Sequence, residues 1–264
     1  MGFSRTSTRR ALVLAFLVSA SCSLKPKPQA ENPLLADLVD ARAGLQLLRD
    51  GRPDEAAQLL IRARQTHPDD PTLPNALGLV LLYKREFPAA VKAFSDSLKL
   101  DPKFAEARVN RGVASMEAGS LGDAENDFRA LVETPGSSER LNARYNLGML
   151  EMRRERWADA EREFSLVLNE DALYTRAFRE RGLARMKTGD HKSALMDFLE
   201  VLKNEPKDPV SNYQAALCLI TTGRRDLALR YMERTVASAP ESDEGKRARR
   251  FLDSEPPDTG LATR

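Results

Sequence analysis

A small side chain recurs through most of the chain at a nearly constant spacing. Six positions about 34 residues apart hold a glycine or an alanine: Gly44, Gly78, Gly112, Gly148, Gly182 and Ala216. Twelve residues after each stands an alanine, and four residues further on a large apolar residue: Ala56, Ala90, Ala124, Ala160, Ala194 and Ala228, then Leu60, Phe94, Phe128, Phe164, Phe198 and Met232. A period of this length restricts the chain to a tandem array of one structural unit, because each unit buries its apolar face only against its neighbours.

Four of the six units also end in a proline at the same offset: Pro68, Pro102, Pro206 and Pro240. Together these positions resemble the tetratricopeptide repeat, in which each unit is a hairpin of two antiparallel helices, A and B. The resemblance implies an all-α fold, a superhelical solenoid of six hairpins. The small residues let the two helices approach, the large residue fills the space beside them, and the proline ends helix B.

The repeat pattern also divides the chain into segments. We expect repeats at residues 37–70, 71–104, 105–140, 141–174, 175–208 and 209–242, then a capping helix at 243–252 and a disordered tail at 253–264. The third repeat is two residues longer than most, at Thr134–Ser138, and the fourth has Ala172 in place of the closing proline. At these two places the solenoid is either kinked or tolerates the change.

Residues 1–21 have the pattern of a secretory signal peptide. Three arginines precede the apolar run Ala11–Ala20, whose 10 residues are too few to span a bilayer. The run ends just before Cys22, and this junction resembles the lipobox of bacterial lipoproteins, in which the cysteine is acylated and becomes the first residue. Ser19 departs from the lipobox, which usually has leucine there. The alternative is an ordinary signal peptide that leaves Cys22 as a free thiol.

The residues after Cys22 bear on where such a lipoprotein would reside. Ser23 follows the cysteine, and by resemblance to the bacterial sorting rule this implies transport to the outer membrane rather than retention at the inner membrane. Residues 22–36 contain three prolines and are expected to form an extended tether of about 40 Å. The lipoprotein interpretation therefore places the repeats at the outer membrane, facing the periplasm and anchored through acyl chains on Cys22.

Composition argues against several classes of function. The net charge is +2, and it falls to about −1 without the three arginines of residues 1–21, so a basic nucleic-acid binder is not expected. Two histidines and two cysteines leave little for a metal site or a disulfide framework. No phosphate-binding glycine loop, HExxH or Gly-x-Ser-x-Gly motif is present. We therefore expect no catalytic residue, cofactor, metal or small-molecule substrate.

The remaining chemistry-bearing residues fit the repeat pattern. His191 occupies a position at which other repeats have a large apolar residue, which favours a packing role. Cys218 lies between two leucines and is expected to be a buried, unreactive thiol. The carboxylates Asp123, Glu125 and Asp127 are interpreted as a solvated face of helix B.

Function is then expected from the surface built by the A helices. With each repeat numbered from its first residue, positions 9 and 12 are apolar in all six repeats, and three further residues flank this stripe: Leu45, Leu48, Leu79, Leu82, Val113, Met116, Met149, Met152, Leu183, Met186, Leu217 and Ile220, with Asn110, Tyr145 and Asn146. We call these fifteen residues the inner stripe. One interpretation is a partner-binding groove whose methionines adapt to an apolar partner. The other is that neighbouring A helices cover the stripe as inter-repeat core; the two interpretations are balanced for position 12, and exposure is favoured for position 9.

The whole architecture resembles the pilotins of type IV pilus systems. Pilotins are outer-membrane lipoproteins that bring secretin subunits to the outer membrane and promote their multimer assembly. The resemblance implies a secretin subunit as the protein partner of the inner stripe. The alternatives are a scaffold lipoprotein that docks peptidoglycan enzymes or the barrel-assembly machinery, and an accessory subunit that regulates an enzyme complex.

Overall fold

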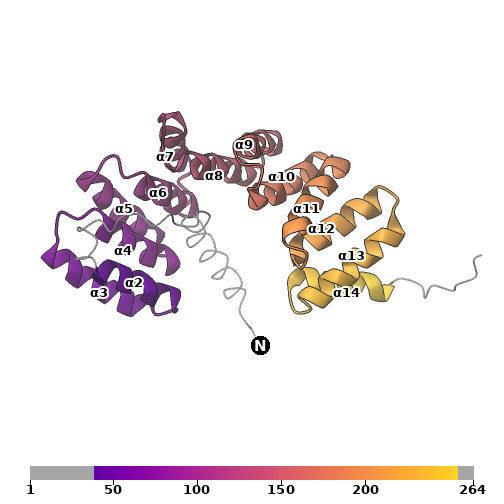
Figure 1. Cartoon of the computed structure of the whole chain (residues 1–264), viewed down its shortest axis with the longest axis horizontal. Coiled ribbons are helices and arrows are strands. Elements are labelled where there is room, and N and C mark those ends of the chain that lie inside the picture. The colour runs from indigo at the N-terminus through magenta and orange to yellow at the C-terminus, as the bar shows by residue number, and fades with distance from the viewer. Residues whose placement is uncertain (1–38, 255–264) are drawn as a thin grey trace, which may run out of the picture. The chain divides into compact units, whose positions relative to one another are not determined.

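A computed structural model describes residues 39–254 (Figure 1). This part of the chain contains only helices and no strand, which confirms the predicted all-α repeat fold. The helices are α2 (Val39–Arg49), α3 (Pro53–Thr66), α4 (Thr72–Tyr83), α5 (Phe87–Leu100), α6 (Ala105–Glu117), α7 (Leu121–Glu133), α8 (Arg140–Arg153), α9 (Trp157–Glu170), α10 (Thr175–Thr188), α11 (His191–Asn204), α12 (Pro209–Thr221), α13 (Arg225–Ser238) and α14 (Asp243–Ser254).

The helices form two compact units, which are described separately. Unit 1 reaches Asn146 and contains α2 to α7 with the first half of α8; unit 2 begins at Leu147. In both units the two helices of a hairpin pack together, and the second helix also contacts the first helix of the next hairpin. The boundary between the units lies within α8, the helix that directly follows the two-residue insertion of the third repeat.

The recurring glycines lie against the large apolar residue of their own repeat. A Cβ atom on Gly78 would lie 2.5 Å from the ring of Phe94, and one on Gly148 would lie 2.6 Å from the ring of Phe164. Real Cβ atoms do not approach other atoms so closely, so glycine is required for the observed helix spacing. The alanine partners of the repeat pattern are fully buried, which matches their expected role in close packing.

Each A helix ends in the same hydrogen-bonded turn. At the end of α8, the backbone N–H of Arg156 donates to the carbonyl of Glu151 and that of Glu155 donates to the carbonyl of Met152, which is a Schellman motif. The residue that corresponds to Glu155 has a positive φ in all six repeats. Four of the six are glycines, and the other two are Arg85 (φ 65°) and Glu155 (φ 58°): Gly51, Arg85, Gly119, Glu155, Gly189 and Gly223.

The two departures from the repeat pattern both lie in connections between helices. Thr134–Ser138 form the connection between α7 and α8, with Gly136 at φ 73°. At the end of α9, Asp171 accepts a hydrogen bond from the backbone N–H of Leu173 at 2.9 Å. Asp101 makes the same contact after α5, where the proline is present. The aspartate, and not the proline, therefore holds this turn in the fourth repeat.

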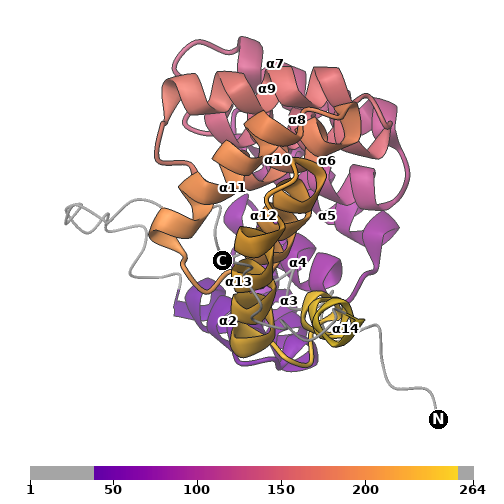
Figure 2. The same ribbon diagram turned by 90° about the vertical axis from the view of Figure 1, so that its right-hand side faces the viewer.

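The last helix covers the end of unit 2. Ala248 is fully buried in a cluster with residues of α12 and α13, and Phe251 and Leu252 pack against the same cluster. Figure 2 shows α14 nearly end-on beside α13. The capping role agrees with the prediction, although the helix continues past Leu252 to Ser254.

The predicted signal peptide (1–21), the predicted tether (22–36) and most of the predicted tail lie outside the described residues. Within residues 39–254, no helix is both long enough and apolar enough to cross a membrane.

Candidate functional site

In unit 1 the inner stripe is mostly covered. The position 12 side chains Leu48, Leu82 and Met116 are 6%, 1% and 3% exposed. Leu79 and Val113 at position 9 are also buried, and only Leu45 is half-buried. The A helices α2, α4 and α6 contact one another directly, so their facing side chains cover each other. The stripe here is inter-repeat core, and the exposure favoured for position 9 is found only at Leu45.

The amides that flank the stripe in unit 1 already have partners within the protein. Asn110 donates through Nδ2 to Oδ1 of Asn75 at 3.0 Å, and Asn75 donates to Oε1 of Glu106 at 3.2 Å. Asn146 donates to the backbone carbonyl of Asn142 at 2.9 Å, while its own Oδ1 is buried without a hydrogen bond. Tyr145 is buried as well. The contacts of Asn75 join α4 to α6, whereas the hydrogen bond of Asn146 lies within α8. Partner binding through Asn110, Tyr145 and Asn146 stays a prediction.

In unit 2 the same positions keep part of their surface. All six side chains are half-buried: Met149, Met152, Leu183, Met186, Leu217 and Ile220. Leu183 and Met186 of α10 pack against a buried cluster that includes Ala215 and Cys218 of α12. One part of each apolar side chain therefore packs in the core, and the other part remains accessible to solvent. In this unit the stripe is thus partly core and partly exposed, and partner binding through it stays a prediction.

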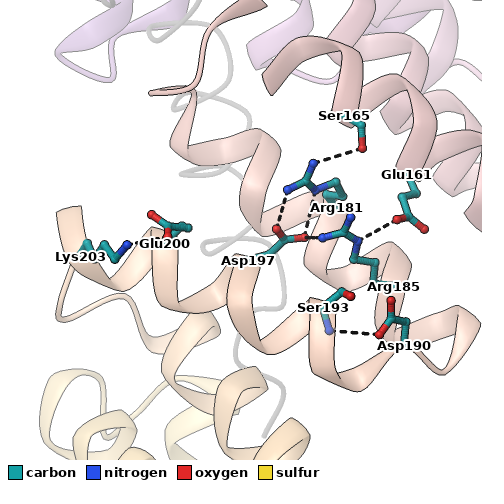
Figure 3. A network of polar contacts seen from close by, with 9 residues as sticks. All are labelled: Glu161, Ser165, Arg181, Arg185, Asp190, Ser193, Asp197, Glu200 and Lys203. Atoms are coloured by element: carbon teal, nitrogen blue, oxygen red, sulfur yellow. Dashed lines mark hydrogen bonds and ion pairs between the residues drawn. The ribbon is translucent and has the colours of Figure 1, made fainter. Parts of the chain in front are cut away.

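An ion-pair network joins three helices of unit 2 (Figure 3). Arg181 of α10 donates from Nε and Nη2 to the two oxygens of Asp197 on α11, at 3.1 and 2.7 Å. Arg185 donates to Asp197 at 2.9 Å and to Glu161 of α9 at 2.8 Å. Arg181 also donates to Oγ of Ser165 on α9 at 3.2 Å. The two arginines thus connect α10 to both of its neighbours.

The centre of this network is well covered. Asp197 is 2% exposed, and burial raises the pKa of its carboxyl while the hydrogen bonds and charges of Arg181 and Arg185 lower it. A buried carboxylate with two guanidinium partners has its charge compensated and its oxygens hydrogen-bonded. The arrangement fixes helix spacing and offers no free group for acid–base chemistry.

The same arrangement occurs in unit 1. Arg111 of α6 donates from Nε and Nη2 to Asp127 of α7 at 2.8 and 2.6 Å, and from Nη1 to Ser95 of α5 at 3.4 Å. Asp127 is 5% exposed, so the interpretation of this residue as part of a solvated face was wrong. The sequence contains a pattern that could have predicted this network. In both units the arginine stands 16 positions after the serine and 16 positions before the aspartate.

The other candidate reactive groups are structural. Cys218 is fully buried, as predicted, and burial raises the pKa of its thiol to about 12. His191 is half-buried at the start of α11, and its Nδ1 is buried without a hydrogen bond. Within residues 39–254, no cluster of histidine, cysteine and carboxylate side chains is arranged to hold a metal ion.

The fold is similar to several solved structures. PilF of Pseudomonas aeruginosa matches with a TM-score of 0.70 at 19% identity, over 83% of this chain and 98% of that one. PilW, described as a widely conserved type IV pilus biogenesis factor, matches with a TM-score of 0.72 at 16% identity, over 82% of this chain and 98% of that one. YrrB, described as having an unusual peptide-binding site, matches with a TM-score of 0.54 at 18% identity, over 74% and 99%. At these identities the likeness concerns the fold.

Sequence comparison gives a partial relative and a family. Protein FlbA of Caulobacter vibrioides is 34% identical over 90 residues, which are 34% of this chain and 15% of that protein. The chain therefore spans a small part of this relative. Residues 75–139 and 145–211 match the profile of the tetratricopeptide repeat. These two segments cover half of the sequence and contain the glycine–aromatic contacts described above, and the chain accordingly belongs to the tetratricopeptide-repeat family.

Proposed function

We propose that this protein is an outer-membrane lipoprotein that binds a type IV pilus secretin subunit and promotes its assembly into multimers. The observation that carries the proposal is the row of half-buried apolar side chains on the A helices of unit 2. Two further features support it: the lipobox-like junction at Cys22, and a fold shared with PilF and PilW over nearly their whole length.

The proposed mechanism is physical rather than chemical. A secretin subunit that has not yet assembled exposes apolar surface and unpaired strand edges, both of which promote aggregation. Half-buried leucine and methionine side chains, held in place by the core behind them, offer an apolar surface that adapts to a partner segment. A lipid anchor on the same chain would raise the local concentration of the complex at the membrane.

The proposal is tested by placing a charge on the accessible edge of the stripe. Met149→Asp and Leu183→Asp each remove part of an apolar contact surface, and centrally placed apolar contacts are often worth about 2 kcal/mol or more in an interface. Because the side chains are only half-buried, we expect each variant to lose about 1 kcal/mol of folding stability, half the value for a fully buried side chain. Both variants should fold, yet heat-resistant secretin multimers should fall sharply on denaturing gels of membranes.

The chain provides a control for each substitution. Met196 on α11 is 68% exposed and Leu173 before α10 is 82% exposed, so Met196→Asp and Leu173→Asp introduce the same charge away from the stripe. Both controls should support normal multimers and melt as the wild type does. Normal multimers in a folded Met149→Asp protein would refute the proposal. If that variant unfolds, the milder Met149→Ser, with the same gel and melting curve, separates loss of fold from loss of binding.

A further inference from the structure

The free face of the last helix is positively charged. Gly245 and Ala248 of α14 are buried and face the body of unit 2. On the side of the helix turned away from them lie Lys246, Arg247 and Arg250, three cations within five residues that share one face by helical spacing. Arg249 is exposed at the edge of this face. No further repeat follows α14 in the described residues.

Three of these cations lack a carboxylate partner within residues 39–254. Lys246 has Glu241 at 3.6 Å, whereas Arg247, Arg249 and Arg250 form no ion pair there. The Nε of Arg250 donates to the backbone carbonyl of Lys246 at 3.3 Å, which leaves both terminal nitrogens of its guanidinium group available. This differs from α10, where Arg181 and Arg185 are both paired with buried or half-buried carboxylates.

An aromatic ring lies beside the cations. Phe251 is half-buried at the edge of α14 and packs against the cluster of the last repeat. The guanidinium of Arg225 on α13 lies 5.4 Å from the centre of this ring. Arg247 is one helical turn before Phe251 on the same side of the helix. The edge of the face therefore combines an aromatic ring with arginines from two helices.

Acidic residues limit which polyanion fits. Asp243 is exposed in the first turn of α14 and, by helical spacing, shares the free face one turn before Lys246 and Arg247. Glu244 stands in the same turn, and Asp253 stands at the other end of the helix. An extended polyanion that ran along the helix would meet these carboxylates on both sides of the cations. Separate phosphate groups, each bound by one or two guanidinium groups, meet only the central part. A surface of separate phosphates next to apolar material matches both the arginines and the half-buried ring.

We propose that the outer face of α14 is a docking surface for the headgroup phosphates of an anionic phospholipid membrane. Arg247 and Arg250 would bind phosphates from the free face, and Arg249 would add charge at its edge. Phe251 and Arg225 would contact the interfacial region at the other edge. The contact orients the end of unit 2 toward the bilayer surface, and it requires neither acylation of Cys22 nor a secretin.

The test uses residues 22–264 with Cys22→Ala, so that neither acylation nor the arginines and apolar run of residues 1–21 contribute to vesicle binding. Sedimentation with vesicles of phosphatidylglycerol and phosphatidylethanolamine measures binding, and vesicles of phosphatidylcholine are the neutral reference. Each cation near an anionic surface contributes about fivefold to affinity, so Arg247→Gln with Arg250→Gln should weaken binding about 25-fold. Raising the salt from 50 to about 300 mM should weaken wild-type binding strongly and should affect the double variant less.

A matched pair of substitutions controls for net charge. Arg42 and Arg62 are exposed on α2 and α3 and have no ion pair within the described residues, so Arg42→Gln with Arg62→Gln should bind vesicles as the wild type does. Equal loss in the two double variants would overturn the proposal, as would wild-type binding that is the same for anionic and neutral vesicles. Tighter binding to a 20-base-pair DNA duplex than to anionic vesicles would overturn it in favour of a nucleic acid. Thermal melts of all variants should coincide.

Discussion

Glu155 provides the sharpest test of how the backbone of this solenoid is held. It occupies the left-handed position of the Schellman turn between α8 and α9, at φ 58°, where four of the other five repeats have glycine. A residue with a Cβ atom pays about 1–2 kcal/mol in this conformation. Glycine removes that strain, but it also gives the unfolded chain more conformational freedom. That freedom lowers the free energy of unfolding by about 0.4–1 kcal/mol and offsets part of the stabilisation. Glu155→Gly should therefore stabilise unit 2 by about 0.5–1 kcal/mol.

The gain is measured by urea unfolding and by a thermal melt followed with circular dichroism. For a domain of this size it corresponds to a rise of about 1–4 °C in the melting temperature. Arg85→Gly should give less, because the guanidinium of Arg85 lies 5.2 Å from the ring centre of Phe87, a contact that is worth about 0.5–1 kcal/mol at an exposed site.

Two controls fix the sign of the effect. Gly189→Glu makes the reverse change in the fifth repeat, where φ is 85°, and should destabilise the protein by about 1 kcal/mol. Gln58→Gly places a glycine at an exposed position in the interior of α3 and should also destabilise it, by about 1 kcal/mol, because helix interiors disfavour glycine. A Glu155→Gly protein that melts at or below the wild-type temperature would refute the reasoning.

Three further predictions concern residues of the network, the core and the N-terminal segment. Asp197→Asn should lower the free energy of unfolding by about 2–3 kcal/mol in a urea titration, less than for a fully buried pair because its arginines stay partly exposed. The control Glu200→Gln breaks an exposed pair with Lys203 and should lower it by under about 1 kcal/mol. Cys218 should react with a thiol reagent only after unfolding, since its side chain is fully buried and the pKa is raised to about 12; rapid labelling of the native protein would contradict this placement. Metabolic labelling with a fatty-acid analogue should tag the wild type and not Cys22→Ala, and a tag that persists in the variant would exclude Cys22 as the acylated residue.

The packing of the hairpins follows from the sequence because it depends on side-chain size at fixed spacing. Gly78 and Phe94 stand at the same offset as the glycine and aromatic residue of the next three repeats, and the structure shows why a larger residue at the first position would not fit. The all-helical fold and the capping role of α14 follow from the same periodicity. Each of these inferences needs only the repeat and the volume of the side chains.

The ion-pair networks and the state of the inner stripe do not follow so directly. Asp127 and Asp197 are charged and lie on B helices, so a pattern of residue types places them in water, although their arginine partners recur at the same separation. Leu82 is 1% exposed whereas its counterpart Met186 is half-buried. The residue types are alike, and what differs is how much of each side chain the surrounding helices cover. That coverage depends on many contacts and has no simple sequence pattern.

The contact between each glycine and the ring of its own repeat has a consequence for how the chain reaches its fold. Gly78 with Phe94, and Arg181 with Asp197, each join residues separated by only 16 positions. Closing so short a loop costs little chain entropy, and proteins dominated by local contacts fold quickly. The two helices of a hairpin are therefore able to meet as soon as their own residues are available, but the hairpin becomes stable only when the next repeat packs on its apolar face. Folding is thus expected to proceed from one repeat to its neighbour along the chain.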